Sequence, residues 1–240
     1  MGEKLSLEEA QKAAGKAQGY LSVAEGKLLY SLANRCTGRG AIVEIGSWKG
    51  RSTIWIGFGS KDGCKAIVFA VDPHTSSPEM PQGNSFREFR RNIENAGLEK
   101  IVKPLVKTSE DAAKDFRGKA EFVFIDGDHS YAHARQDFEL WFPKVLEQGT
   151  MAFHDTMLVP GPRKVVKEKV FFSRHFRNAG FADSITFAQK VSQNTFAERL
   201  HNYRVFALKE FFTLVSRINI AAGLPKQLKA AGKKILKAVQ

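Results

Sequence analysis

Short apolar runs alternate with stretches of helical spacing along most of this chain. Each run is bounded by glycine or polar residues, which is typical of strands covered on both faces of a sheet. We predict β-strands at Ala41–Ile45, Ala66–Val71, Ile101–Val106, Phe122–Ile125 and Thr150–Phe153. Helices between them are predicted near Ser52–Gly59, Ser85–Ala96, Ser109–Phe116 and Tyr131–Val145. Strands that alternate with helices indicate right-handed crossovers and a mostly parallel sheet.

The two ends of the chain add further predicted elements. Residues 6–35 predict a helical segment that opens with the capping-box-like Ser6–Glu9. After Pro160–Pro162 we expect a helix at Lys164–Phe176. Two late apolar runs, Ser184–Val191 and Tyr203–Leu208, predict an antiparallel pair at one edge of the sheet.

These elements together predict an α/β fold that is Rossmann-like. We expect a seven-stranded, mostly parallel sheet with helices on both faces and an antiparallel edge strand. The chain divides into an N-terminal helical segment at 1–38, a sheet domain at 39–209 and a basic C-terminal helical extension at 210–240. We expect the N-terminal segment to cover the ligand site or to form part of a substrate pocket.

Polar residues follow each predicted parallel strand directly. Ligands of open α/β sheets bind outside the carboxyl ends of the strands, where strand order reverses. The segments at those ends are Glu44–Gly46, Asp72–His74, Thr108–Glu110, Asp126–His129 and His154–Thr156. Acids after the first, second, fourth and fifth strands would share one edge, so we predict a ligand site there.

The loop after the first strand reads Glu44-x-Gly46-x-x-x-Gly50. The two glycines let backbone approach a ligand closely, and Ser52 can begin the next helix. A pyrophosphate loop would not place a carboxylate beside its glycines without cost, so Glu44 favours a cationic ligand or one rich in hydroxyl and amino groups. A nicotinamide-dependent oxidoreductase would need Gly-x-Gly-x-x-Gly, and position 48 is Trp48.

The next two strand ends predict contacts to a nucleoside. Asp72 ends the second strand, where an acid can accept both ribose hydroxyls. A helix-capping role is the alternative, since Asp72–Pro73 would suit a turn. Ser109 and Glu110 could meet an adenine edge, or Ser109 could cap a helix with Glu110 in its first turn.

The densest polar cluster follows the fourth and fifth strands. Asp126 and Asp155 end these adjacent strands, with His154 beside them. Such an oxygen-rich site suits Mg²⁺, although paired carboxylates can instead bind substrate hydroxyls or cap helices. His129 follows Asp126 by three positions and is a candidate general base.

These residues together resemble the class I S-adenosylmethionine (SAM)-dependent methyltransferases over about Leu21–Leu208. The motif at Glu44–Gly50 and the acid Asp72 carry the resemblance. The segments Ile125–Tyr131 and His154–Thr156 are similar to the small-molecule O-methyltransferase branch, which includes catechol-type and macrocin-type enzymes. The resemblance implies a SAM cofactor and methyl transfer to a small-molecule or sugar hydroxyl.

The resemblance also implies roles for individual residues. Cofactor binding falls to Glu44, Gly46, Ser47, Gly50, Ser52, Asp72, Ser109, Glu110 and Asp126. His129 and Asp126 would be catalytic, and Asp126, His154 and Asp155 would hold a metal. The sequence departs from the family twice. His154 stands where macrocin-type enzymes carry a second acid, and Thr156 stands where catechol-type enzymes carry an amide ligand.

The composition indicates a basic globular protein, with 43% hydrophobic residues and a net charge of +12 over 240 residues. We find no apolar run long enough to span a membrane and no signal-peptide core near the start. The two cysteines, Cys36 and Cys64, show no metal spacing. We therefore expect a cytoplasmic protein, with peripheral attachment to a membrane left open.

The C-terminal segment carries the positive charge in its most concentrated form. Residues 224–240 hold five lysines and no acid, with apolar residues at helical spacing. A basic amphipathic helix suggests an anionic membrane surface or a partner groove, and a packed or frayed terminal helix is the alternative. The apolar Phe211–Val215 could dock on the body, on a second subunit or on lipid, which leaves a homo-oligomer open.

The charge also supports a second function class, a protein that binds RNA or a membrane surface and retains a donor-binding fold. The chain has no aromatic-and-glycine signature of RNA-binding modules, so we do not expect a nucleic-acid partner.

Overall fold

The computed structural model describes residues 2–75 and 85–221. Its core is a seven-stranded sheet in the order β3-β2-β1-β4-β5-β7-β6. The strands are β1 Ala41–Ile45, β2 Val68–Val71, β3 Val102–Leu105, β4 Ala120–Ile125, β5 Val145–Phe153, β6 Phe176–Ala182 and β7 Ile185–Lys190. The first five are parallel, and β7 runs antiparallel to both β5 and β6. The predicted fold class is confirmed.

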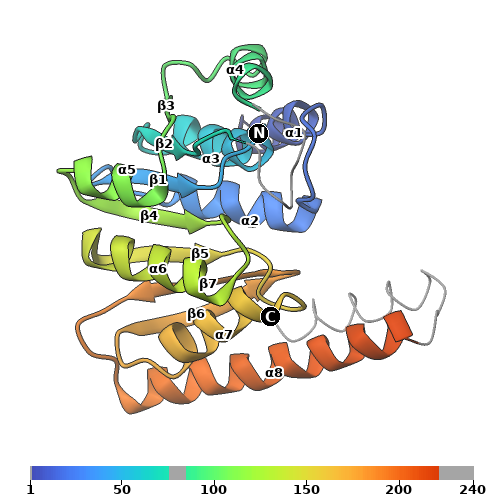
Figure 1. Ribbon diagram of the computed structural model, residues 1–240, viewed down its shortest axis with the longest axis vertical. Coiled ribbons are helices and arrows are strands. Elements are labelled where there is room, and N and C mark those ends of the chain that lie inside the picture. The colour runs from blue at the N-terminus through green and yellow to red at the C-terminus, as the bar shows by residue number, and fades with distance from the viewer. Residues whose placement is uncertain (1, 76–84, 222–240) are drawn as a thin grey trace.

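Helices cover both faces of this sheet (Figure 1). On one face lie α1 Gly2–Ala14, α2 Val23–Asn34, α3 Arg51–Asp62 and α4 Phe86–Asn95, which pack on the even-numbered side chains of β1 and β4. On the other lie α5 Ser109–Asp115, α6 Tyr131–Trp141 and α7 Pro160–Val166, which pack on Val43, Ile45 and Val123. The side chains of the inner strands alternate between these two cores because each face of the sheet is covered.

The N-terminal segment differs from the prediction. It forms two helices, α1 and α2, and the predicted capping box at Ser6 is wrong because Ser6 lies inside α1. The true capping box lies at Ser22 and Glu25, which bond each other's backbone N–H groups. Gly15 and Gly19 lie in the break between the helices, where glycine weakens a continuous helix.

The C-terminal part holds a second correction. The predicted helix Lys164–Phe176 is instead the end of α7 followed by a π-helical turn, η2 Lys167–Phe171. Strand β6 was not expected, because Asn178, Ala179 and Gly180 hide its alternation. The predicted strand Tyr203–Leu208 is wrong, since it lies inside the long helix α8 Phe196–Ala221. The antiparallel edge therefore pairs β7 with β5 and β6.

Helix α8 packs along β6 and continues past the body of the protein (Figure 1). It runs unbroken through the predicted boundary at residues 209 and 210. The lysine-rich segment 224–240 lies outside the described residues. Within the described part of the chain, no helix combines the length and the hydrophobicity that crossing a membrane requires.

Candidate active site

A cavity of about 540 Å³ opens at the carboxyl ends of the parallel strands. The loops after β1, β2, β4 and β5 line it, together with the start of α5 and residues 18–21. Most of the predicted site residues are among the lining, namely Gly46, Ser47, Ser52, Asp72, Ser109, Glu110, Asp126, His129, His154 and Asp155. Two others, Glu44 and Gly50, lie behind that wall.

Glu44 is fully buried under the first loop. Its Oε2 accepts a hydrogen bond from the Thr53 hydroxyl on α3, and its Oε1 has no partner among the described residues. Burial, reinforced by the nearby charges of Asp126 and Asp72, raises the pKa of Glu44 to about 7. The structure thus places Glu44 as a support between β1 and α3, one layer away from the cavity surface.

The two glycines of the first loop are required by the backbone itself. Gly46 has a φ of 89°, and a Cβ there would lie 2.0 Å from the carbonyl oxygen of Asp126. Gly50 has a φ of 85° and forms the N-terminal cap position of α3, packed on Phe89. Both conformations favour glycine, and the loop can therefore turn sharply between β1 and α3.

Asp72 stabilises the loops after β1 and β2 by hydrogen bonds and also lines the cavity. Its Oδ2 accepts from the Trp48 backbone N–H at 2.8 Å, and its Oδ1 accepts from the His74 N–H at 2.7 Å. Asp72 therefore holds a turn, and the cap position of the following helix α4 is Ser85 instead. Each carboxylate oxygen has more than one acceptor position, so the same side chain can still receive hydroxyl groups from the cavity.

Helix α5 begins shortly after the end of β3. Thr108, rather than Ser109, caps α5 by accepting from the Asp111 N–H. The Ser109 hydroxyl instead accepts from Trp141 Nε1 at 3.0 Å. Glu110 lies in the first turn, as predicted, and pairs with Lys114 at 2.8 Å. Both Ser109 and Glu110 reach the cavity wall.

An aromatic wall stands beside the first loop, and the sequence did not single it out. The rings of Tyr20 and Trp48 stack nearly parallel, with centroids 6.3 Å apart. Lys49 Nζ lies 4.9 Å from the Trp48 centroid and donates to Gln18 at 2.6 Å. Residues 18–21 thus bring the N-terminal segment to the cavity, where that segment was expected.

Three residues at this rim have positive φ angles although none is glycine. They are Trp48 at 41°, His74 at 52° and Asp155 at 55°. Such conformations cost about 1–3 kcal/mol each and persist where the surroundings hold them. They follow the ends of β1, β2 and β5, so the strain gathers at the edge that carries the cavity.

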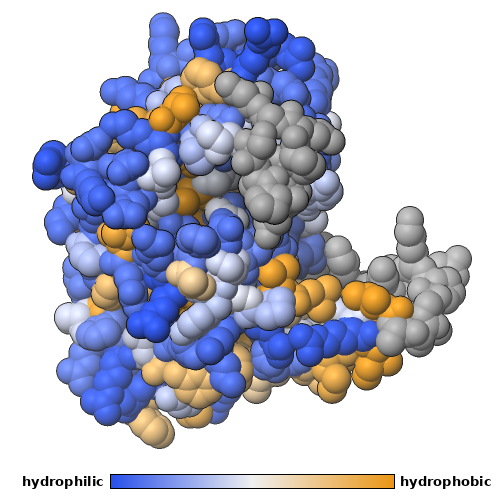
Figure 2. Space-filling view, in the orientation of Figure 1, coloured by the Kyte–Doolittle hydropathy of each residue, from blue (hydrophilic) through white to orange (hydrophobic). Residues whose placement is uncertain are grey.

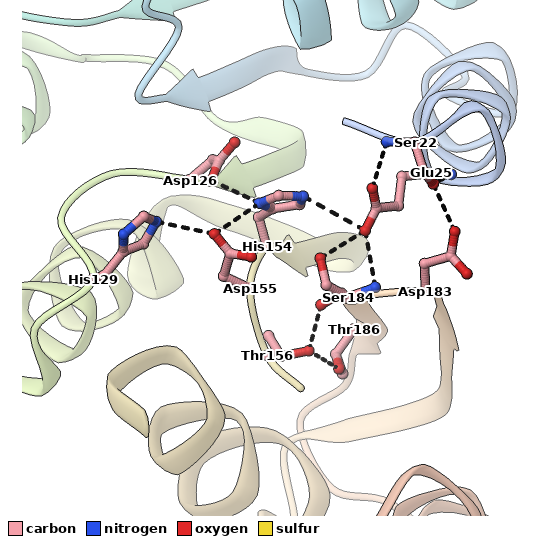
Figure 3. A network of polar contacts seen from close by, with 10 residues as sticks. All are labelled: Ser22, Glu25, Asp126, His129, His154, Asp155, Thr156, Asp183, Ser184 and Thr186. Carbon is pink, nitrogen blue, oxygen red and sulfur yellow. Dashed lines mark hydrogen bonds and ion pairs between the residues drawn. The ribbon is translucent and has the colours of Figure 1, made fainter. Parts of the chain in front are cut away.

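A network of carboxylates and imidazoles fills the end of the cavity beside β4 and β5 (Figure 3). His154 Nδ1 lies 3.1 Å from Asp126 Oδ1 and 3.3 Å from Asp155 Oδ2. His129 Nε2 lies 3.1 Å from the same Asp155 oxygen. The four residues that the sequence placed at these strand ends therefore meet.

Glu25 on α2 is the member that sequence reasoning missed. Its Oε1 lies 3.5 Å from His154 Nε2 and also accepts from the backbone N–H and hydroxyl of Ser184, at 2.8 and 2.6 Å. Ser22 reaches across in the same way to Asp183 in the β6–β7 turn. The capping box that starts α2 thus ties that helix to the far hairpin and to His154, and no sequence motif signals this contact.

The electrostatics of the network favour a charged His154. Burial alone would lower its pKa, but the Asp126 charge and the hydrogen bonds to Asp126, Asp155 and Glu25 raise the pKa of His154 to about 12. Burial likewise opposes the ionisation of Glu25, yet the bonds from His154 and Ser184 lower its pKa to about 2. Hydrogen bonds from His129 and His154 overcome burial and hold the pKa of Asp155 well below its usual range.

The three residues predicted to bind a metal lie together, but a proton on His154 could occupy the position that the metal would take. One donor atom each from Asp126, His154 and Asp155 lies within 4.8 Å of the others. The His154 nitrogen that faces both carboxylates is a single atom, Nδ1. A proton on that atom already satisfies the two acids, and a metal would have to take its place. The geometry therefore fits an imidazolium better than it fits Mg²⁺, which prefers oxygen ligands.

Comparison with known proteins agrees with this arrangement. Residues 43–156 match a family model described as a methyltransferase domain. That range runs from within β1 to just past the end of β5 and includes the loops after β1, β2, β4 and β5 that line the cavity.

Solved structures with the same fold include several O-methyltransferases. The O-methyltransferase from Bacillus cereus in complex with SAH is 21% identical, with 78% of this chain and 91% of that chain covered and a TM-score of 0.56. The O-methyltransferase TomG from Streptomyces achromogenes, in complex with SAM, is 18% identical over 78% and 90% of the chains, with a TM-score of 0.56. The O-methyltransferase NovP is 18% identical over 71% and 81%, with a TM-score of 0.61. At these identities the likeness concerns the fold.

Proposed function

We propose that this protein, whose residues 43–156 match a family model described as a methyltransferase domain, transfers a methyl group from SAM to a hydroxyl oxygen of a small, hydroxyl-rich molecule. The observation that carries this proposal is that the Asp72 side and the His129–Asp155 pair open into one cavity. A donor nucleoside and an acceptor hydroxyl could then meet within it.

The donor half lies at the ends of β1, β2 and β3. Asp72 would accept the ribose hydroxyls, while Ser109 and Glu110 would approach the adenine edge. The comparison structures from Bacillus cereus and Streptomyces achromogenes hold SAH and SAM, which supports the same donor here. A sulfonium cation is also favoured by a rim of acids.

The acceptor half is acidic. Asp126, Asp128 and Asp155 line this end of the cavity, so a carboxylated or phosphorylated acceptor would meet like charge. Neutral hydroxyl groups can donate to those carboxylates. The Tyr20–Trp48 stack beside the first loop adds a flat apolar surface to the same cavity, on which a sugar or aromatic ring could lie. We therefore favour a neutral polyhydroxyl acceptor.

His129 is our candidate for the general base. Asp155 Oδ2 lies 3.1 Å from its Nε2, and a proton held on Nε2 by that carboxylate would leave the lone pair on Nδ1. As the acceptor oxygen forms its bond to the methyl carbon, the hydroxyl proton passes to His129, and Asp155 stabilises the imidazolium. SAM supplies the electrophilic methyl group, and the C–S electron pair stays on sulfur. Alignment of the two reactants can lower the barrier by roughly 7–11 kcal/mol in favourable cases.

We assign no step to a metal ion. His154 lies between Asp126, Asp155 and Glu25, and in its protonated form it would balance their charge where a divalent cation could otherwise do so. The role of Asp126, His154 and Asp155 in this proposal is to shape the acceptor end and to hold His129.

The test is methyl transfer from isotopically labelled SAM to matched acceptors. A neutral catechol or sugar should be methylated on oxygen, and its carboxylated analogue should react far more slowly. Absence of SAM binding at millimolar concentration would overturn the donor assignment. Equal turnover of the neutral and anionic acceptors would overturn the acceptor class.

A further inference from the structure

Helix α8 packs against the body with one face and exposes apolar side chains on the opposite face. Its inner face holds the partly buried Val205 and Phe206 together with the buried polar residues Asn202, Lys209 and Thr213. Lys209 donates to the backbone carbonyl of Thr156, directly after Asp155, and so anchors the helix to the end of β5. The opposite face holds exposed apolar side chains three or four positions apart in two groups that lie eight positions, about two helical turns, from each other: Phe196, Leu200 and Tyr203, then Phe211, Leu214 and Ile218. We call this set the outer stripe.

The side chains of the outer stripe are largely exposed to solvent. Phe211, Leu214 and Ile218 are 57%, 56% and 54% exposed. Phe172, the residue directly after η2, adds to the patch, and the centroid of its ring lies 5.3 Å from that of Tyr203. Figure 2 shows orange side chains gathered along the projecting end of α8. A contiguous apolar patch of this kind marks a contact surface.

The charges around the outer stripe are positive. The two acids of α8 are neutralised, since Glu198 pairs with Arg177 and Glu210 pairs with Arg163. Arg204 and Arg217 are exposed and, within the described part of the chain, form no ion pair. Lys167 lies on the adjoining η2, 6.0 Å from the Phe206 ring. The chain then continues into residues 224–240, which hold five lysines and no acid.

We propose that the outer stripe of α8 docks on an anionic lipid surface. Exposed aromatic and aliphatic side chains beside arginine and lysine are the pattern of an interfacial helix, which inserts its apolar side chains and pairs its cations with headgroups. A second copy of this chain fits less well, because two stripes facing each other would bring their positive rims together. The inference is independent of the methyl acceptor.

The arrangement in space suits such a surface. In Figure 1 the red end of α8 extends beyond the body on the side toward which the arrowheads of β1 and β4 point. A flat surface could therefore reach the end of the helix without meeting the sheet.

The experiment is co-sedimentation of the full-length protein with lipid vesicles. We expect binding to vesicles of phosphatidylcholine with phosphatidylglycerol, little binding to phosphatidylcholine alone, and weakening as salt rises. Leu214→Ser should lower the affinity about tenfold, because a side chain of this size loses its apolar burial. The matched control is Val106→Ser, at a residue that is 50% exposed and far from α8 in the fold.

Two further measurements distinguish a lipid surface from a second copy of this chain as the partner of the outer stripe. The melting temperature should stay unchanged in both variants, since both side chains are exposed. Equal vesicle binding by the two variants, or no binding to anionic vesicles, would overturn the proposal. A dimer in sedimentation velocity that Leu214→Ser converts to a monomer would assign the outer stripe to a second copy instead.

Discussion

The imidazole of His129 is held by Asp155, with Nε2 3.1 Å from Oδ2. Asp155 adopts a φ of 55°, which turns its carboxylate away from the direction that a continuing strand would give it. The backbone turn at the end of β5 thus places an acid against a histidine from the neighbouring loop. This contact sets the orientation from which His129 would receive a proton.

Replacing His129 by alanine should remove the base and leave the donor site intact. We expect kcat to fall by about 10²–10⁴-fold, the range that a positioned proton acceptor contributes. The affinity for SAM should stay within twofold. The control is His175→Ala, because His175 bonds the Ser192 carbonyl away from the cavity. Full activity in the His129 variant would remove the base assignment.

Substitutions of Asp72 and Glu44 should affect SAM affinity differently, because Asp72 faces the cavity and Glu44 is buried behind it. Asp72→Asn keeps one acceptor oxygen and loses the charge, so SAM affinity should fall about 10- to 100-fold, the equivalent of roughly 1.5–3 kcal/mol for hydrogen bonds to a charged group. Glu44→Gln should bind SAM nearly as the native protein does, because Glu44 lies behind the cavity wall. Isothermal titration of SAM measures both. The reverse order of effects would return Glu44 to direct donor binding.

Glu44 should also make the protein less stable as the pH rises. Its folded pKa of about 7 lies above the unfolded value, so the folded state binds more protons between about pH 4.5 and 7 and loses stability across that window. Glu44→Gln removes this dependence and should gain up to about 3 kcal/mol relative to the native protein at pH 8. Urea unfolding at pH 5 and pH 8 checks it. A difference between the two proteins that does not grow with pH would contradict the burial argument.

Glu25→Gln should loosen the tie between α2, His154 and the β6–β7 turn. The folded pKa of Glu25 is lowered to about 2, so its stabilisation is present above about pH 4.5 and fades as the pH falls toward 2. At pH 7 the variant should lose about 3 kcal/mol of unfolding free energy. Thermal unfolding from pH 7 to pH 3 should show the two proteins converge. Exposed Glu99→Gln is the control.

Removal of divalent ions should leave methyl transfer intact. His154 supplies the positive charge between Asp126 and Asp155, so exhaustive treatment with a chelator should change turnover by less than twofold. Loss of activity that returns with Mg²⁺ would show that a cation displaces the His154 proton. The metal site expected from the sequence stays a prediction that this measurement decides.

The sequence alone predicted which residues lie at the carboxyl ends of the strands. It did not predict the contacts that other elements make with those residues. Asp72, Asp126 and Asp155 could be placed together because parallel strands bring their carboxyl ends to one edge. Glu25 could not be found, since it reaches the site through a helix cap, and its partner Ser184 lies 159 positions away. Tyr203–Leu208 misled because a helix with two apolar faces has no clear polar side to mark its period. The position of Glu44 in the first loop was predicted, but its burial behind the cavity wall could not be read from the motif, and its role in donor binding stays a prediction.

The direction in which α8 projects has a consequence for how the reaction would be measured. A protein held at a lipid surface by that helix would still receive its small, neutral acceptor from the surrounding solution. Its turnover would then follow the acceptor concentration in solution, and added vesicles would change where the enzyme is and leave its kcat unchanged.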